Sequence, residues 1–111
     1  MSTRTNNVRQ MLEEQGFDPE YFRKQGTEDM TFYAAHLGLD VQGRDAVADA
    51  LAKAFTGGNP RFQVHGDPVE QGNFVIAFYQ ATLSSGEKRE ICQVFRYADD
   101  DRISGVVTMR G

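Results

Sequence analysis

The hydrophobic pattern changes its period at Pro60, and this change constrains the fold more than any other feature of the chain. Before Pro60, apolar residues recur at helical spacing, as in Val47, Leu51 and Phe55. After it they alternate with a period of two, and turn-forming residues interrupt them at short intervals. Helices followed by a run of strands predict an α+β domain with helices on one face of a mostly antiparallel sheet. A length of 111 residues fits one domain, so we treat residues 1–111 as a single unit.

Three helices and one strand are predicted before Pro60. The helices cover residues 6–15, 19 to Gly26, and the segment between Gly43 and Gly57. The second has the clearest start, because Asp18 is a favourable N-cap and Phe17 can pack on Phe22. Between the second and third helices, residues 29–36 are rich in strand formers and residues 37–40 resemble a turn.

Four further strands are predicted after Pro60, over residues 62–69, 74–83, 89–97 and 102–110. The short turns between them are typical of antiparallel neighbours. Pro68 has no amide proton, so it predicts a bulge or an edge position in its strand.

Both faces of the strand over 74–83 are apolar. One parity carries Phe74, Ile76, Phe78, Gln80 and Thr82, and the other carries Val75, Ala77, Tyr79, Ala81 and Leu83. Three modest helices can cover one face, so the second face needs another cover, most simply the same face of a second copy. We therefore predict a homodimer that associates through the outer face of the sheet.

Charge and composition exclude several classes of function. Twelve Lys and Arg against sixteen Asp and Glu give a net charge of −4, which argues against a nucleic-acid partner. The N-terminal sequence MSTRTNNVRQ lacks the apolar run of a signal peptide, and no membrane association is predicted. A single cysteine, Cys92, cannot form an intramolecular disulfide. We expect a cytoplasmic protein.

The sequence carries no motif for a metal or a cofactor. His36 and His65 are the two imidazoles, and no Cys or His pair has metal-ligand spacing. The glycines form no nucleotide-binding loop. The run Asp99–Asp101 is explained by a solvated turn, and Cys92 by a small buried side chain within a strand. We therefore predict no cofactor and no metal.

Glutamine and histidine are the polar residues best placed for a site. The three predicted C-terminal strands have acid-free interiors, whereas Gln80 and Gln93 share the apolar parity of their strands. A buried glutamine needs hydrogen-bond partners, which can be backbone, water or a ligand oxygen. His36 ends the first predicted strand, where it acts as a capping group or takes part in proton transfer.

Four segments in order resemble the nuclear transport factor 2-like superfamily, in its SnoaL-like and ketosteroid-isomerase-like branch. They are Glu28–Phe32, Gly43–Val47, Cys92–Tyr97 and Arg102–Arg110. The resemblance spans nearly the whole chain. It implies a curved antiparallel sheet wrapped into a cone, three helices of the N-terminal half closing an apolar pocket, and a sheet-to-sheet homodimer.

The resemblance also implies catalytic positions, and this chain departs from them. The proton-shuttling Asp of the ketosteroid isomerases falls on Ala34, and their protonated Asp falls on Gln93. Their tyrosine donor has no counterpart between Val8 and Gln15. Steroid isomerisation by that mechanism is therefore not expected.

Two functions follow as hypotheses. In the first, the pocket binds a small, mostly apolar, oxygenated molecule, and proton transfer by an isomerase, cyclase or dehydratase uses His36 as base or acid and Gln93 as oxyanion donor. In the second, the same fold is a non-catalytic module for ligand binding or dimerisation. The residues predicted to contact the bound molecule are Tyr21, Phe32, Ala34, Phe55, Phe78, Gln80, Phe95 and Met109.

Overall fold

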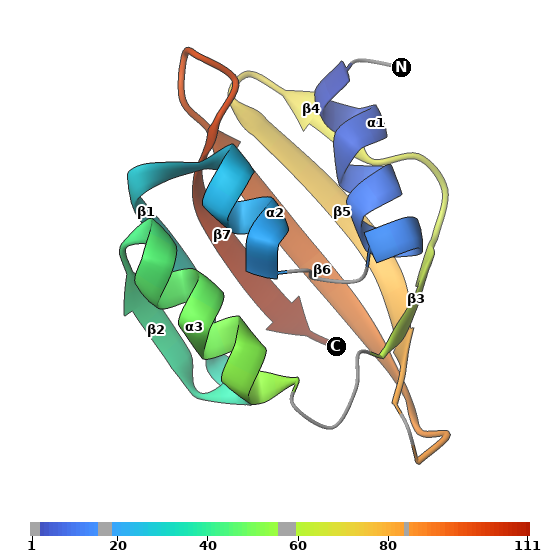
Figure 1. Cartoon of the computed structure of the whole chain (residues 1–111). Coiled ribbons are helices and arrows are strands. Elements are labelled where there is room, and N and C mark those ends of the chain that lie inside the picture. Colours follow the sequence, from blue (N-terminus) through green and yellow to red (C-terminus); the bar gives the residue numbers. More distant parts are fainter. Residues whose placement is uncertain (1–2, 16–18, 56–59, 84) are drawn as a thin grey trace.

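A computed structural model describes residues 3–15, 19–55, 60–83 and 85–111, and places the helices on one face of a curved sheet (Figure 1). The α-helices are α1 (Thr3–Gln10), α2 (Pro19–Gln25) and α3 (Arg44–Ala54). α1 continues into a π-helical segment, η1 (Met11–Gln15). All three predicted helices are present. The proposed cap at Asp18, the Phe17 contact and the glycine stop after α3 lie outside the described residues. Within the described ranges, no helix is long and apolar enough to cross a membrane.

Among the described residues, seven strands form the sheet. They are β1 (Gly26–Ala34), β2 (Leu39–Gln42), β3 (Arg61–Val64), β4 (Val69–Gln71), β5 (Phe74–Thr82), β6 (Lys88–Tyr97) and β7 (Ile103–Arg110). The order is β2-β1-β7-β6-β5-β3, and β4 also pairs with β5. The α+β prediction is confirmed. Most pairs are antiparallel as expected, but β1 and β7 run parallel, which makes the sheet mixed.

The segment after β1 forms a hairpin, whereas the sequence predicted a strand to His36 and then a turn. β1 ends at Ala34, and a 3-10 turn, η2 (Ala35–Leu37), follows. Gly38 has a left-handed conformation with φ of 69°, and its N–H donates to the carbonyl of Ala35 at 3.1 Å. Glycine adopts this conformation at no steric cost, so the chain can reverse here. β2 then pairs antiparallel with β1, and His36 lies in the turn.

The predicted strand over 62–69 is divided into β3 and β4. Both pair with β5, and the chain leaves the sheet between them. Pro68 lies in this break, where its missing amide proton costs no hydrogen bond of the ladder. The sequence predicted a bulge or an edge position within one strand, whereas Pro68 lies outside both strands, in the break between them.

The core lies between the helices and the inner face of the sheet. Val47, Ala48 and Leu51 form the buried stripe of α3. From α2, the fully buried Phe22 packs edge-to-face on Phe32 of β1, with ring centroids 6.1 Å apart. The inward side of β5 carries small side chains beside one large one, Tyr79. Such alternation lets the helices approach the sheet closely.

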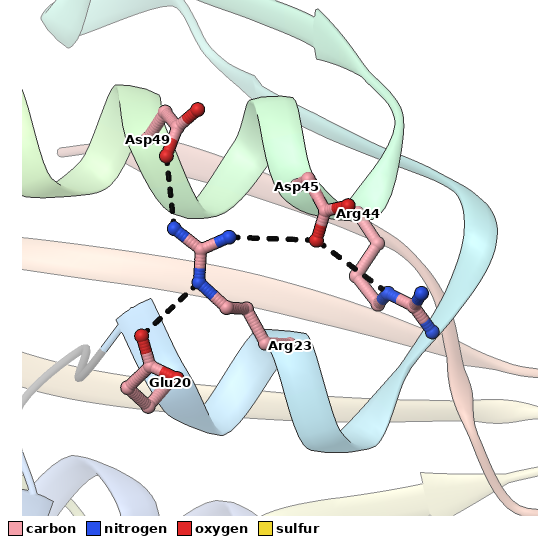
Figure 2. Close-up of polar contacts among 5 residues, drawn as sticks. All are labelled: Glu20, Arg23, Arg44, Asp45 and Asp49. Atoms are coloured by element: carbon pink, nitrogen blue, oxygen red, sulfur yellow. Dashed lines mark hydrogen bonds and ion pairs between the residues drawn. The ribbon is translucent and has the colours of Figure 1, made fainter.

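A surface ion network joins α2 to α3 (Figure 2). The guanidinium of Arg23 donates to Glu20 at 3.1 Å on its own helix, and to Asp45 at 3.4 Å and Asp49 at 2.8 Å on α3. Arg44 adds a longer contact to Asp45, at 3.9 Å. These contacts join the exposed surfaces of α2 and α3.

Candidate functional site

An apolar pocket of about 270 Å³ opens at one end of the sheet's inner face. Its apolar walls come from α3, β1, β3 and β6 and from the segments that follow α3 and β5. They include Phe32, Leu51, Phe55, Phe62, Leu83 and Ile91. Its polar lining consists of His36, Tyr79, Arg89 and Thr108. Among the described residues that line it there is no Asp or Glu.

Three buried side chains form a hydrogen-bonded chain at the pocket, and its two ends, Tyr79 and Thr108, line the cavity. Tyr79 on β5 donates its phenolic proton to Oε1 of Gln93 on β6, at 3.2 Å. Nε2 of Gln93 donates to Oγ1 of Thr108 on β7, at 2.8 Å. Gln93 and Thr108 are cross-strand partners, so the sheet register itself places them together. Because Thr108 Oγ1 accepts from Gln93, it keeps its own proton to donate into the pocket that it lines.

Burial keeps the Tyr79 phenol of this hydrogen-bonded chain protonated. It raises the pKa of Tyr79 far above its usual value of 10.0, with a smaller contribution from Cys92. The phenol is therefore a neutral donor at any physiological pH. The neutral phenol keeps the proton that it donates to Oε1 of Gln93, and the amide nitrogen of the same glutamine donates to Thr108.

His36 stands at the pocket from the 3-10 turn after β1. Partial burial lowers the pKa of its imidazole from 6.5, and the positive charges of Arg110 and Arg89 lower it further. Protonation here would bring a third positive charge beside two arginines. The imidazole is consequently neutral near pH 7 and can accept a proton.

The structure brings three of the predicted site residues together. His36, Phe32 and Phe55 all line the pocket. Gln93 is fully buried and lies one hydrogen bond behind the lining, so Thr108 rather than Gln93 presents a donor to the cavity. Ala34 and Phe95 are fully buried in the core and do not line the pocket.

Three other predicted contacts lie on the opposite face of the sheet. Phe78 and Met109 are about half exposed, at 54% and 47%, and Gln80 donates to Glu90 at 3.4 Å. The pairing of Ala77 with Gln93 puts odd-numbered residues of β5 on the same face as Gln93. Gln80 and Phe78 therefore point away from the pocket, because neighbouring positions in a strand face opposite sides. Tyr21 lines a different, more polar depression between α1 and α2.

Sequence reasoning did not assign Tyr79, Thr108 and Arg89 to the pocket. Tyr79 is an odd-numbered residue of β5, whereas the even-numbered residues Phe78 and Gln80 were chosen for the pocket from the sequence. The pairing of β5 with β6 is centred on Ser85, so odd-numbered residues of β5 lie opposite odd-numbered residues of β6, and Tyr79 lies opposite Ile91. A prediction of this register would have placed Tyr79 on the pocket side. Both parities were apolar, however, so hydrophobicity alone could not choose the face.

Some residue groups assemble no site. Within the described parts of the chain, no three His, Cys, Asp or Glu side chains gather as a metal ion would require. Cys92 lies on the outer face between Phe78 and Met109 in the ladder, and burial raises the pKa of its thiol. Asp100 hydrogen-bonds the backbone and side chain of Arg102, which is the turn role expected from the sequence.

A comparison with models of protein families identifies the family to which this chain belongs. The model of the SnoaL-like domain matches residues 8–106, almost the whole chain. This chain belongs to the SnoaL-like family. The resemblance that the sequence indicated is thereby confirmed. No protein with a curated description matches the SnoaL-like chain significantly.

Solved structures share the fold at low sequence identity. A candidate isomerase of the SnoaL-like family from Agrobacterium tumefaciens is 18% identical, with a TM-score of 0.77 and 99% of each chain covered. A SnoaL-like protein of unknown function from Burkholderia thailandensis is 12% identical, with a TM-score of 0.79, covering 100% of this chain and 97% of the other. A candidate ketosteroid isomerase from Kribbella flavida is 13% identical, with a TM-score of 0.76, covering 97% and 77%. At these identities the likeness of the SnoaL-like chain to them concerns the fold alone.

Proposed function

We propose that this SnoaL-like protein binds a small, mostly apolar, oxygenated molecule in the pocket beside His36. The observation that supports the proposal is the Thr108 hydroxyl, held by the Tyr79–Gln93 chain at the wall of an otherwise largely apolar cavity. Ligand pockets typically combine apolar walls with a few fixed polar groups. A volume of about 270 Å³ suits a molecule of one or two rings. The free cysteine is in keeping with a cytoplasmic setting.

The test compares a ketone with a hydrocarbon of the same shape. Thermal-shift titrations with 2-tetralone and tetralin should stabilise the protein more with the ketone, because native-state binding raises stability. Thr108→Val removes the donor and should abolish the ketone's advantage. Thr82→Val, on the outer side of β5, should keep it. Stabilisation by neither compound would overturn the proposal.

A second variant tests whether the pocket itself is the site. Ala81→Leu adds bulk to the lining and should weaken binding of the ketone and the hydrocarbon alike. Ala52→Leu makes the same change on the exposed side of α3 and should leave binding unchanged. Equal binding to both variants would place the ligand elsewhere.

A proton-transfer reaction is the second candidate function, because a neutral imidazole lines the same pocket. In this reaction His36 takes a proton from the carbon next to the ligand carbonyl. Thr108 donates a hydrogen bond to the enolate oxygen that forms, and the imidazolium returns a proton. Gln93 is then a positioning residue for Thr108, rather than the oxyanion donor that the sequence suggested. The structural relatives named as candidate isomerases are compatible with this chemistry.

Deuterium exchange distinguishes a catalyst from a binding module. In D₂O, the wild type should speed the exchange of the α-protons of 2-tetralone, followed by NMR. His36→Gln should lose this acceleration without losing binding, whereas His65→Gln, which lies away from the pocket, should retain it. Binding without exchange in the wild type would favour the non-catalytic module.

We also propose that two copies associate through the outer face of the sheet. This face carries the cross-strand row Phe78, Cys92 and Met109 beside the row Ile76, Val94 and Val107. None of these six side chains is buried in the single chain. Extended apolar patches on soluble proteins are typical of interfaces, and a second copy offers a self-complementary surface.

A further inference from the structure

Arg89 is a charged residue on the inward face of β6. It has the same parity as the buried Ile91 and Gln93, and it pairs with Ala81 across the ladder. Arginine in such a row is unusual, because charged side chains are seldom placed on a buried face without a partner. Arg89 lines the pocket near the turn that joins β5 to β6.

The hydrogen bonding of this guanidinium is incomplete. One terminal nitrogen, Nη2, contacts Glu87 at 3.1 Å, and the Glu87 side chain is 53% exposed. The Nε–H is buried and has no hydrogen-bond partner. A solvated pair of this kind contributes little, whereas a buried donor without an acceptor is costly. Arg89 therefore has a buried donor that no described protein group satisfies.

The charge around the pocket favours an anion. Arg89 is the one permanently charged side chain among the described residues that line the pocket. Arg110 is a second positive group close enough to act on His36. Without a lining Asp or Glu, this positive potential faces a low-dielectric cavity, where a charge acts more strongly than in water.

We propose that the natural ligand of this pocket carries a carboxylate and that Arg89 binds it. The inference rests on the proposed function, because it specifies the polar group of the molecule bound there. A carboxylate takes the Nε and one Nη of arginine as a bidentate pair, and Nε is the position that Glu87 leaves vacant. The proposal includes a turn of the Arg89 side chain, because Nε is buried and must reach the pocket to bind the carboxylate.

The ligand class is thus a small aromatic or alicyclic carboxylic acid. Its apolar body lies among Phe32, Leu51 and Phe62, and its carboxylate lies toward the β5–β6 turn beside Arg89. A neutral molecule of equal shape gains the apolar contacts and leaves Nε unsatisfied. Arg89 is therefore expected to account for the difference in affinity between the carboxylic acid and the neutral molecule.

Calorimetric titration with 2-naphthoate and 2-naphthamide tests this inference, because the two probes share a shape and differ in charge. In the wild type, the acid should bind about tenfold or more tightly than the amide, a typical gain for charge-assisted hydrogen bonds. Arg89→Gln should bring the two affinities together by weakening the acid. Arg61→Gln removes the same charge from the outward side of β3 and should keep the preference.

The outcomes separate the two proposals. Equal binding of acid and amide by the wild type would overturn the carboxylate and leave the apolar pocket in place. A preference that survives Arg89→Gln would overturn the role of Arg89. Binding of neither probe would overturn this inference together with the pocket proposal. Melting temperatures of the unliganded variants establish that each is folded.

Discussion

Gln93 is the residue on which the polar part of the site depends. It is fully buried, and both ends of its amide are used, one by Tyr79 and one by Thr108. A buried amide that is satisfied on both sides fixes the orientation of its neighbours, which an apolar side chain of the same size cannot do. The glutamine therefore determines which hydrogen-bonding group the pocket presents.

Gln93→Leu should destabilise the fold. The change removes the acceptor of Tyr79 and the donor to Thr108, and a lost partner of a buried polar group costs about 1–3 kcal/mol. Urea unfolding measures the loss. Gln63→Leu, on the exposed side of β3, should change the free energy of unfolding by less than about 0.5 kcal/mol. Equal effects of the two changes would show that the hydrogen bonds from Tyr79 through Gln93 to Thr108 do not stabilise the fold.

The titration of His36 provides a second test at this scale. Burial, Arg110 and Arg89 hold its pKa below 6.5, so the unfolded chain takes up this proton at higher pH than the native protein does. The contribution of His36 to stability is therefore fully present above pH 6.5 and is lost as the pH falls through the native pKa. Arg110→Gln should raise the pKa of His36, as followed by NMR of the imidazole protons.

A matched arginine variant controls for total charge. Arg61→Gln removes one positive charge from the outward side of β3 and should leave the titration of His36 as in the wild type. If both variants moved the pKa equally, the shift would come from net charge rather than from the position of Arg110.

The site could be predicted from sequence only in part, for reasons visible in single residues. His36 was identified at the end of its predicted strand, Phe32 from the same parity of that strand, and Phe55 from the apolar spacing of the third helix. Phe78 was placed on the wrong face, because β5 is apolar on both sides and only the register of β5 against β6 distinguishes Phe78 from Tyr79. Arg89 was not recognised, since a charge near a turn normally indicates a solvated end of a strand.

Among the elements, the ion network between α2 and α3 is centred on one side chain. Arg23 reaches three carboxylates on two helices, and each of those carboxylates is largely exposed. A network that shares one guanidinium is more favourable than an isolated surface pair, but salt weakens it because the charges face water.

Arg23→Met should lower the melting temperature at low ionic strength. The difference from the wild type should shrink at 1 M salt, where the Debye length is about 3 Å instead of about 10 Å at 0.1 M. Lys24→Met removes a neighbouring charge on the same helix that makes none of the contacts of Figure 2, and should have a smaller effect. A loss that does not depend on salt would indicate lost packing of the arginine stem instead.

The elements themselves were largely predictable, and the exceptions were non-local. α3 follows from its periodicity, and α2 from Pro19 at its first position. β2 was missed because residues 37–40 were interpreted as a turn, and its four alternating residues are too few to indicate a strand without the pairing with β1. The parallel pairing of β1 with β7 joins segments far apart in the sequence, so no local signal contains it.

For the whole molecule, the apolar outer face predicts association. Light scattering of the wild type at micromolar concentration should give twice the mass of the chain. Phe78→Glu places a charge at the centre of the proposed interface and should give the monomer mass. Ala52→Glu, on the helical side, should remain dimeric. A monomeric wild type would contradict the proposed dimer.

The central place of β7 has a consequence for biosynthesis. Before residues 103–110 leave the ribosome, β1 with β2 forms one fragment and β5 with β6 another, and each exposes the strand edge that β7 will later occupy. Pairing of Thr31 with Gly105 must then close a loop of about two thirds of the chain, which is slow for contacts of such separation. Folding therefore cannot finish before β7 has been synthesised, and until then the two unpaired edges are open to pairing with other chains.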